Sequence, residues 1–124
     1  MPATPISTAN AGHYTWGKDA PAGCDAWYLV RTPDLHILEE LMPPGTSETP
    51  HHHTRARQFF YVLAGELTLS VEGQPHTLHA HQGLEIAPGE LHQAINRSDS
   101  PVRFLVTSHP PSHGDRIDHL APGT

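Results

Sequence analysis

Prolines and glycines interrupt this chain so often that it has little room for a helix. The 124 residues include 13 prolines and 10 glycines, and both residue types favour turns and break helices. Between these breaks lie short runs rich in aromatic and β-branched residues, which strands favour. The clearest run, Leu67–Val71, alternates apolar and polar side chains, so one of its faces should be buried. The sequence therefore predicts an all-β protein.

At least eight short strands are expected, closely spaced and separated by turns, as is typical of a β-sandwich or a small barrel. The expected strands cover residues 27–30, 35–42, 58–64, 67–71, 77–79, 83–87, 92–96 and 102–108. The length suits a single domain. We therefore expect a barrel at residues 25–108, an N-terminal tail at residues 1–24 and a C-terminal tail at residues 109–124.

Charge and composition argue against several classes of partner. The formal net charge is −6 and no basic stripe is present, so we expect no nucleic-acid partner and no membrane partner. The N-terminus does not resemble a signal peptide, and no apolar run is long enough to span a bilayer. These features lead us to expect a cytoplasmic protein. The single cysteine, Cys24, cannot form an internal disulfide.

Histidines occur at a spacing that suits a metal site. If residues 51–53 are extended, His51 and His53 point to one face and His52 points to the other. Gln58 on the next strand and His92 on a later strand can join them on the inner face of a barrel. Three imidazoles and one amide oxygen suit one divalent transition metal, such as Fe, Mn, Ni, Cu or Zn, with positions left open for water or a ligand.

These residues form two motifs that resemble those of the cupin superfamily. The first runs from Gly45 to Gly65 with the pattern G-x5-H-x-H-x4-Q-x6-G, and the second runs from His81 to Asn96 with the pattern H-x5-A-x-G-x2-H-x3-N. The resemblance covers residues 35–108 and implies a single-domain double-stranded β-helix, or jelly-roll barrel. It also implies a homodimer and the metal ligands His51, His53, Gln58 and His92.

The chain departs from the family pattern at three positions. Gln58 stands where the usual carboxylate ligand sits, which removes one negative charge and should favour metals that prefer imidazole. His81 and Ala87 replace the first glycine and the first proline of the second motif. Neither of these two residues is a predicted ligand, so the expected metal site is unchanged.

Other polar residues have simpler interpretations. His76, His79 and His81 alternate, but they fall in a polar hairpin, so a second metal site there is not expected. Glu48 lies close enough in sequence to serve as a partner for an imidazole N–H. For Glu40 we expect a surface ion pair or no contact with a ligand.

The resemblance implies a metal-centred pocket for a small polar or aromatic molecule, but it leaves the function open, because one fold supports many activities. A metal-dependent dioxygenase and a Lewis-acid isomerase or lyase are both possible enzymes. No general base is evident beside the ligands, which weakens proton abstraction more than oxygen activation. The alternatives are a non-catalytic module that binds or senses a small ligand, and a barrel without metal.

Overall fold

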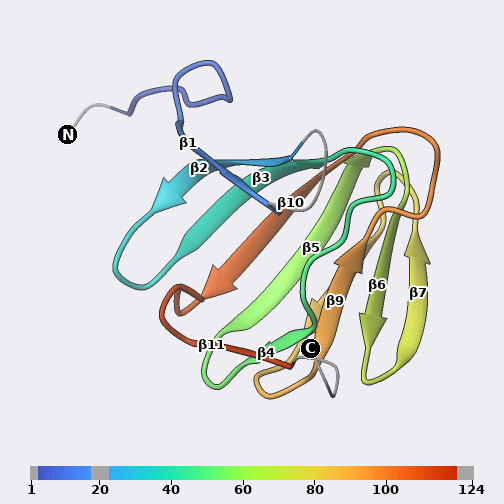
Figure 1. Cartoon of the computed structure of the whole chain (residues 1–124). Helices are drawn as coiled ribbons and strands as arrows, with labels where there is room; N and C mark the ends of the chain where they lie inside the picture. Colours follow the sequence, from blue (N-terminus) through green and yellow to red (C-terminus); the bar gives the residue numbers. More distant parts are fainter. Residues whose placement is uncertain (1–2, 18–22, 120–124) are drawn as a thin grey trace.

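Two antiparallel β-sheets face each other and form a double-stranded β-helix (Figure 1). The computed structural model describes residues 3–17 and 23–119, and within these ranges the chain forms eleven strands and no helix. The strands are β1 (Gly12–Trp16), β2 (Cys24–Arg31), β3 (His36–Met42), β4 (His51–His53), β5 (Arg57–Ala64), β6 (Leu67–Val71), β7 (Gln74–Leu78), β8 (Gly83–Ile86), β9 (His92–Ile95), β10 (Val102–His109) and β11 (Arg116–Asp118). The six-stranded sheet has the order β1-β2-β3-β10-β5-β8, and the five-stranded sheet has the order β11-β4-β9-β6-β7. In the described part of the chain, no helix is long and apolar enough to cross a lipid bilayer.

The expected all-β fold is confirmed, and each expected strand is present with ends that differ by up to three residues. The structure adds strands in both segments for which the sequence predicts tails. β1 pairs with β2 along its whole length, and β11 pairs with β4. Both terminal segments therefore contribute to the sheets that surround the candidate site.

The hairpin between β6 and β7 differs from its expected form. The turn consists of Glu72 and Gly73, whose φ angles are 50° and 79°, as in a two-residue hairpin turn of type I′. β7 therefore begins at Gln74, three residues before the predicted start, and includes Pro75. Proline is tolerated there because β7 is an edge strand, which leaves one side of its backbone unpaired.

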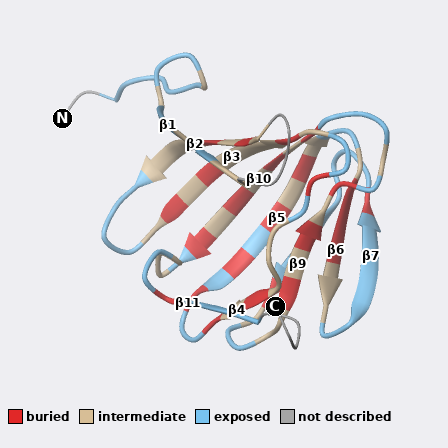
Figure 2. Ribbon diagram, in the orientation of Figure 1, coloured by how far each residue is buried: buried red, intermediate tan, exposed pale blue. Residues whose placement is uncertain are grey.

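The core lies between the two sheets, where the buried residues of facing strands meet (Figure 2). β10 shows the pattern most clearly, because every second residue from Val102 to Ser108 is buried. β10 also lies between β3 and β5, so it joins the two halves of the six-stranded sheet. The largest fully buried apolar side chains are Phe104, Met42, Leu67, Leu69, Ile86, Val62 and Val102.

One motif glycine is required by a close backbone contact. Gly65 follows β5 with a φ of +87°, and a Cβ atom at this position would lie 2.5 Å from the carbonyl oxygen of Pro101. Gly45 has a φ of +77° but faces open space. Both positions favour glycine because of their positive φ, and Gly65 has the additional steric reason.

Asp115 fixes the C-terminal segment against the loop that follows β4. Its carboxylate accepts hydrogen bonds from the backbone N–H groups of Thr54 (3.1 Å), Arg55 (3.0 Å) and Ala56 (2.8 Å), and from the Thr54 hydroxyl. Burial alone would raise the pKa of Asp115, but these hydrogen bonds outweigh it and hold the pKa far below its usual range. The ionised carboxylate therefore anchors β11 beside β4.

Candidate metal centre

The three predicted histidine ligands converge inside the barrel. His51 and His53 project from β4, and His92 projects from β9, where it pairs directly with His51. One ring nitrogen from each residue lies within 4.8 Å of the others, and all three side chains are buried. His52 points away, with its Nδ1 atom 2.6 Å from Nε2 of His119. The expected alternation along residues 51–53 is therefore confirmed.

Backbone carbonyl groups fix the tautomers of two of these rings. Nδ1 of His51 lies 2.8 Å from the Thr49 carbonyl oxygen, and Nδ1 of His92 lies 2.9 Å from that of Glu90. Because a carbonyl oxygen only accepts, each Nδ1 carries the hydrogen and each Nε2 keeps its lone pair. A hydrogen bond from the ring nitrogen that does not bind the metal is the usual way in which a metal-binding imidazole is oriented.

Burial keeps the three imidazoles neutral. It lowers the pKa values of His51 and His53 to about 4, and at His53 the neighbouring His51 and His92 add to this effect. The pKa of His92 is also lowered, mainly by burial. All three rings are therefore in their metal-binding form at neutral pH. Nδ1 of His53 is buried and has no protein hydrogen-bond partner within the described ranges.

Gln58 joins the histidines from β5. Its amide nitrogen donates to the Ser108 hydroxyl (2.9 Å), which turns the amide oxygen Oε1 toward Nε2 of His92, 3.1 Å away. Since Nδ1 of His92 carries the hydrogen, two lone-pair atoms face each other across this short distance. A divalent cation held by both atoms would remove this repulsion. The residues present therefore fit a divalent metal ion.

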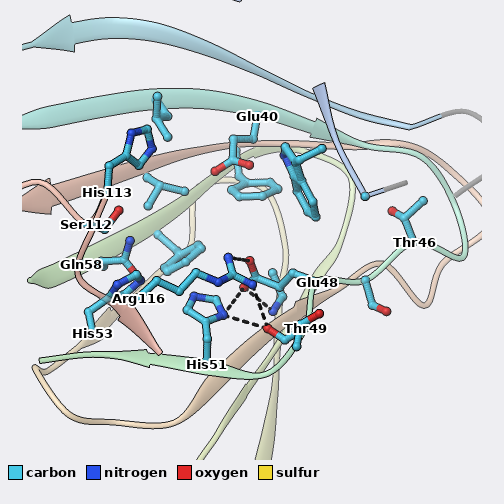
Figure 3. Close-up of a pocket in the computed structure, with 18 of the residues that line it drawn as sticks. Glu40, Thr46, Glu48, Thr49, His51, His53, Gln58, Ser112, His113 and Arg116 are labelled. Atoms are coloured by element: carbon cyan, nitrogen blue, oxygen red, sulfur yellow. Dashed lines mark hydrogen bonds and ion pairs between the residues drawn. The ribbon is translucent and has the colours of Figure 1, made fainter. Parts of the chain in front are cut away.

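A pocket of about 790 Å³ opens beside the histidines (Figure 3). The volume lies within the usual range for a small-molecule site. Its inner part is lined by apolar side chains such as Phe60, Phe104 and Val106, and its polar wall includes Glu40, Glu48 and Arg116. Arg116 comes from β11, so the C-terminal segment anchored by Asp115 forms part of the pocket.

Glu48 lies beside the centre in a different role from the expected one. One carboxylate oxygen accepts from the backbone N–H of Ala94 (2.9 Å) and lies 3.9 Å from Nδ1 of His51. The hydrogen of that nitrogen goes instead to the Thr49 carbonyl. Glu48 therefore lies beside the imidazole without orienting it through a hydrogen bond.

The structure places Glu40 in the pocket wall, whereas the sequence predicts a surface ion pair or no contact. β3 alternates, so Glu40 shares its inward face with Leu38 and Met42. Burial and, next, the Glu48 carboxylate raise the pKa of Glu40 to about 8. The alternation within residues 36–42 places Glu40 on the same face as Leu38 and Met42, but the sequence alone did not show that this face is the inward one.

The other histidines expected to lie in a polar hairpin do not form a second centre. His76, His79 and His81 are all exposed, and His79 lies 3.8 Å from Glu66. Among the described residues, His51, His53 and His92 form the only group of three or more histidine, cysteine or acidic side chains close enough to hold one metal ion.

Sequence comparisons find known proteins that are similar to this chain. The chain is 27% identical over 79 residues to the tetracenomycin polyketide synthase protein TcmJ of Streptomyces glaucescens, a match that covers 64% of this chain and 53% of TcmJ. It is 36% identical over 74 residues to β-D-galactosidase Rv1717 of Mycobacterium tuberculosis, covering 59% of this chain and 62% of Rv1717. The matched region thus spans little more than half the length of these curated relatives.

The fold also superposes on a solved structure with a TM-score of 0.75. That protein is a sugar phosphate isomerase of the cupin superfamily from Silicibacter pomeroyi, 17% identical, and the match covers 98% of this chain and 95% of the other. At this identity the likeness shows the fold alone. The family model of the cupin domain matches residues 38–108, more than half of the chain, so this protein belongs to the cupin family.

Proposed function

We propose that this cupin is a metal-dependent isomerase or lyase that acts on a small polar molecule. In this proposal His51, His53 and His92 hold one divalent transition metal ion, and Gln58 supplies the fourth ligand atom. The observation that supports the proposal most directly is the convergence of three buried histidines, whose ring nitrogens lie within 4.8 Å of one another beside a pocket of about 790 Å³.

The chain's own residues give the site its properties. The Thr49 and Glu90 carbonyls orient His51 and His92, and Ser108 orients the Gln58 amide. A bound divalent ion would supply a Lewis acid that polarises a substrate oxygen. Phe60 and Phe104 form an apolar part of the lining that excludes water from one side of the ligand.

Glu40 favours proton-transfer chemistry over oxygen activation. The sequence offered no general base beside the ligands, and the structure supplies a carboxyl group in the same pocket. Its pKa of about 8 lies near neutral pH, where a group can both accept and release a proton. Isomerases and lyases need such a group, and the likeness in fold to a sugar phosphate isomerase is consistent with this choice.

The first test is elemental analysis of the untagged protein. We expect one equivalent of a divalent transition metal in the wild type and in His52→Ala, and none in the double variant His53→Ala/His92→Ala. His52 is the matched control because it belongs to the same strand and points away. Retention of metal by the double variant, or no metal in the wild type after reconstitution, would refute the proposed site.

The second test separates the reaction classes. The metal-loaded protein is incubated in D₂O with a panel of hydroxy ketones, beginning with dihydroxyacetone, and NMR measures deuterium incorporation next to the carbonyl group. We expect exchange that requires both the metal and Glu40. Oxygen consumption without exchange would favour a dioxygenase, and tight ligand binding without any turnover would favour a binding or sensing module.

A further inference from the structure

The pocket wall formed by β1 and β3 carries three hydrogen-bonding side chains that are not predicted metal ligands. Tyr14 and Trp16 alternate on β1, so both face the pocket. Glu40 reaches the same wall from β3, because Ala26 on β2 pairs with Tyr14 on one side and with Glu40 on the other. Figure 3 shows the Glu40 carboxyl directed into the pocket, across from His51.

This wall, composed of Tyr14, Trp16 and Glu40, has unused hydrogen-bonding capacity. Nε1 of Trp16 is buried and has no hydrogen-bond partner within the described ranges. The indole lies near enough to Glu40 to oppose the rise of its pKa, but the two groups form no hydrogen bond of normal geometry. Burial also raises the pKa of Tyr14 well above its usual range, so its hydroxyl keeps its hydrogen.

The position of Glu40 lowers the stability of the fold. Glu40 shares its inward row with Ala26 on one side and the core residue Phe104 on the other. A half-buried carboxyl beside apolar neighbours lowers stability when it ionises, and an apolar side chain at this position should raise stability. A group that lowers stability at the wall of a pocket is typical of a residue that serves a ligand.

We propose that Tyr14, Trp16 and Glu40 bind the hydroxyl groups of a small polyhydroxylated ligand of the sugar or sugar-acid class. The proposal rests on the proposed function in one respect, because the other end of the ligand would lie at the metal centre. A hydroxyl group has one donor and two acceptor sites, so one hydroxyl can accept from Trp16 and donate to Glu40. A carbonyl oxygen or an aromatic ring cannot serve both groups in this way.

The test measures binding by isothermal titration calorimetry on zinc-loaded and on metal-free protein. The hydroxylated probes are D-galactose and myo-inositol. Cyclohexanol is the matched control for inositol, because it has the same ring but only one hydroxyl group for the three wall residues. Benzoate is an aromatic control that can bind metal but has no hydroxyl group to share between Trp16 and Glu40. We expect both hydroxylated probes to bind, and cyclohexanol and benzoate to bind at least about tenfold more weakly.

The variants locate the binding to this wall. Tyr14→Phe, Trp16→Phe and Glu40→Leu should each weaken binding of the hydroxylated probes by roughly tenfold, the effect of one lost hydrogen bond. Glu40→Gln should retain most of the affinity, because an amide can still donate and accept. Glu39→Gln and Trp27→Phe are the controls, since both positions lie on the opposite face of their strands, and neither should change binding. Metal content should be the same in all these proteins.

The outcomes separate this inference from the proposed function. If no metal is retained but the wall variants still weaken sugar binding to the metal-free protein, the inference stands and the proposed function fails. If metal is retained and the wall variants bind the hydroxylated probes as the wild type does, the inference is overturned and the metal site is unaffected. Preference for benzoate over both hydroxylated probes, or no binding of either hydroxylated probe, would also overturn it.

Discussion

Replacing Glu40 by glutamine should stabilise the metal-free protein at neutral pH. Burial and the nearby Glu48 raise the pKa of Glu40 from 4.5 to about 8. The unfolded chain therefore ionises this group at a lower pH than the folded chain does. Between these two pH values the folded state binds more protons, so its stability must fall as the pH rises.

The size of the effect follows from the pKa values. Each pH unit between the unfolded and folded pKa values costs about 1.4 kcal/mol. From pH 4.5 to pH 7 the accumulated cost is about 3 kcal/mol, an upper bound because pocket water screens the charge. A glutamine has a similar shape and never ionises, so Glu40→Gln should recover much of this free energy at pH 7 and almost none at pH 4.5.

The assay is urea denaturation of both proteins in EDTA at pH 5, 6, 7 and 8. The quantity of interest is the difference in unfolding free energy between variant and wild type, because the buried histidines contribute almost equally to both. We expect this difference to grow with pH and to level off near pH 8. Glu85→Gln, an exposed acid on β8, should show no such growth. Parallel stability curves for wild type and Glu40→Gln would refute our account of the buried acid.

Three further predictions concern the metal centre and the backbone around it. The pKa values of His51 and His53 are about 4, so protons should compete with the metal only near that pH. Metal content after dialysis should therefore be unchanged at pH 6 and should fall between pH 5 and pH 4. Loss of metal between pH 7 and pH 6 would contradict this prediction. Asp115→Ala should cost about 3 kcal/mol, because the backbone N–H groups of Thr54, Arg55 and the buried Ala56 lose their acceptor. Hydrogen exchange at residues 54–56 should accelerate. The exposed Asp118→Ala is the control, and equal exchange in both variants would count against the anchor. Gly65→Ala should lower the free energy of unfolding, measured by urea denaturation, by about 3 kcal/mol or more, and Gly45→Ala should lower it by about 1 kcal/mol. The difference is expected because, of these two glycines, only Gly65 combines a positive φ with a steric clash. Equal losses would show that the contact with Pro101 relaxes.

The candidate centre was largely predictable because it depends on local periodicity and motif spacing. The two-residue period of a strand is enough to separate His51 and His53 from His52. The position of Glu40 was harder to predict, because its burial depends on which face of β3 meets β10 and on the cover that β1 provides. The expected homodimer stays a prediction.

The terminal strands could not be predicted for a related reason. β1 and β11 have no buried apolar face, and their side chains are intermediate or exposed. β11 is instead held by pairing with β4 and by Asp115, which contacts residues about 60 positions earlier in the chain. Such long-range polar anchoring leaves no periodic pattern in the local sequence.

The position of β10 between β3 and β5 has a consequence for biosynthesis. During translation β3 and β5 both emerge before residues 102–109, so the six-stranded sheet stays in two parts with unpaired edges. Its closure requires contacts between residues that are far apart in the chain, which slows folding. A nascent chain that ends before residue 102 therefore exposes strand edges that can pair with other chains. The chain must be synthesised at least as far as residue 109 before the barrel that carries the histidines can close.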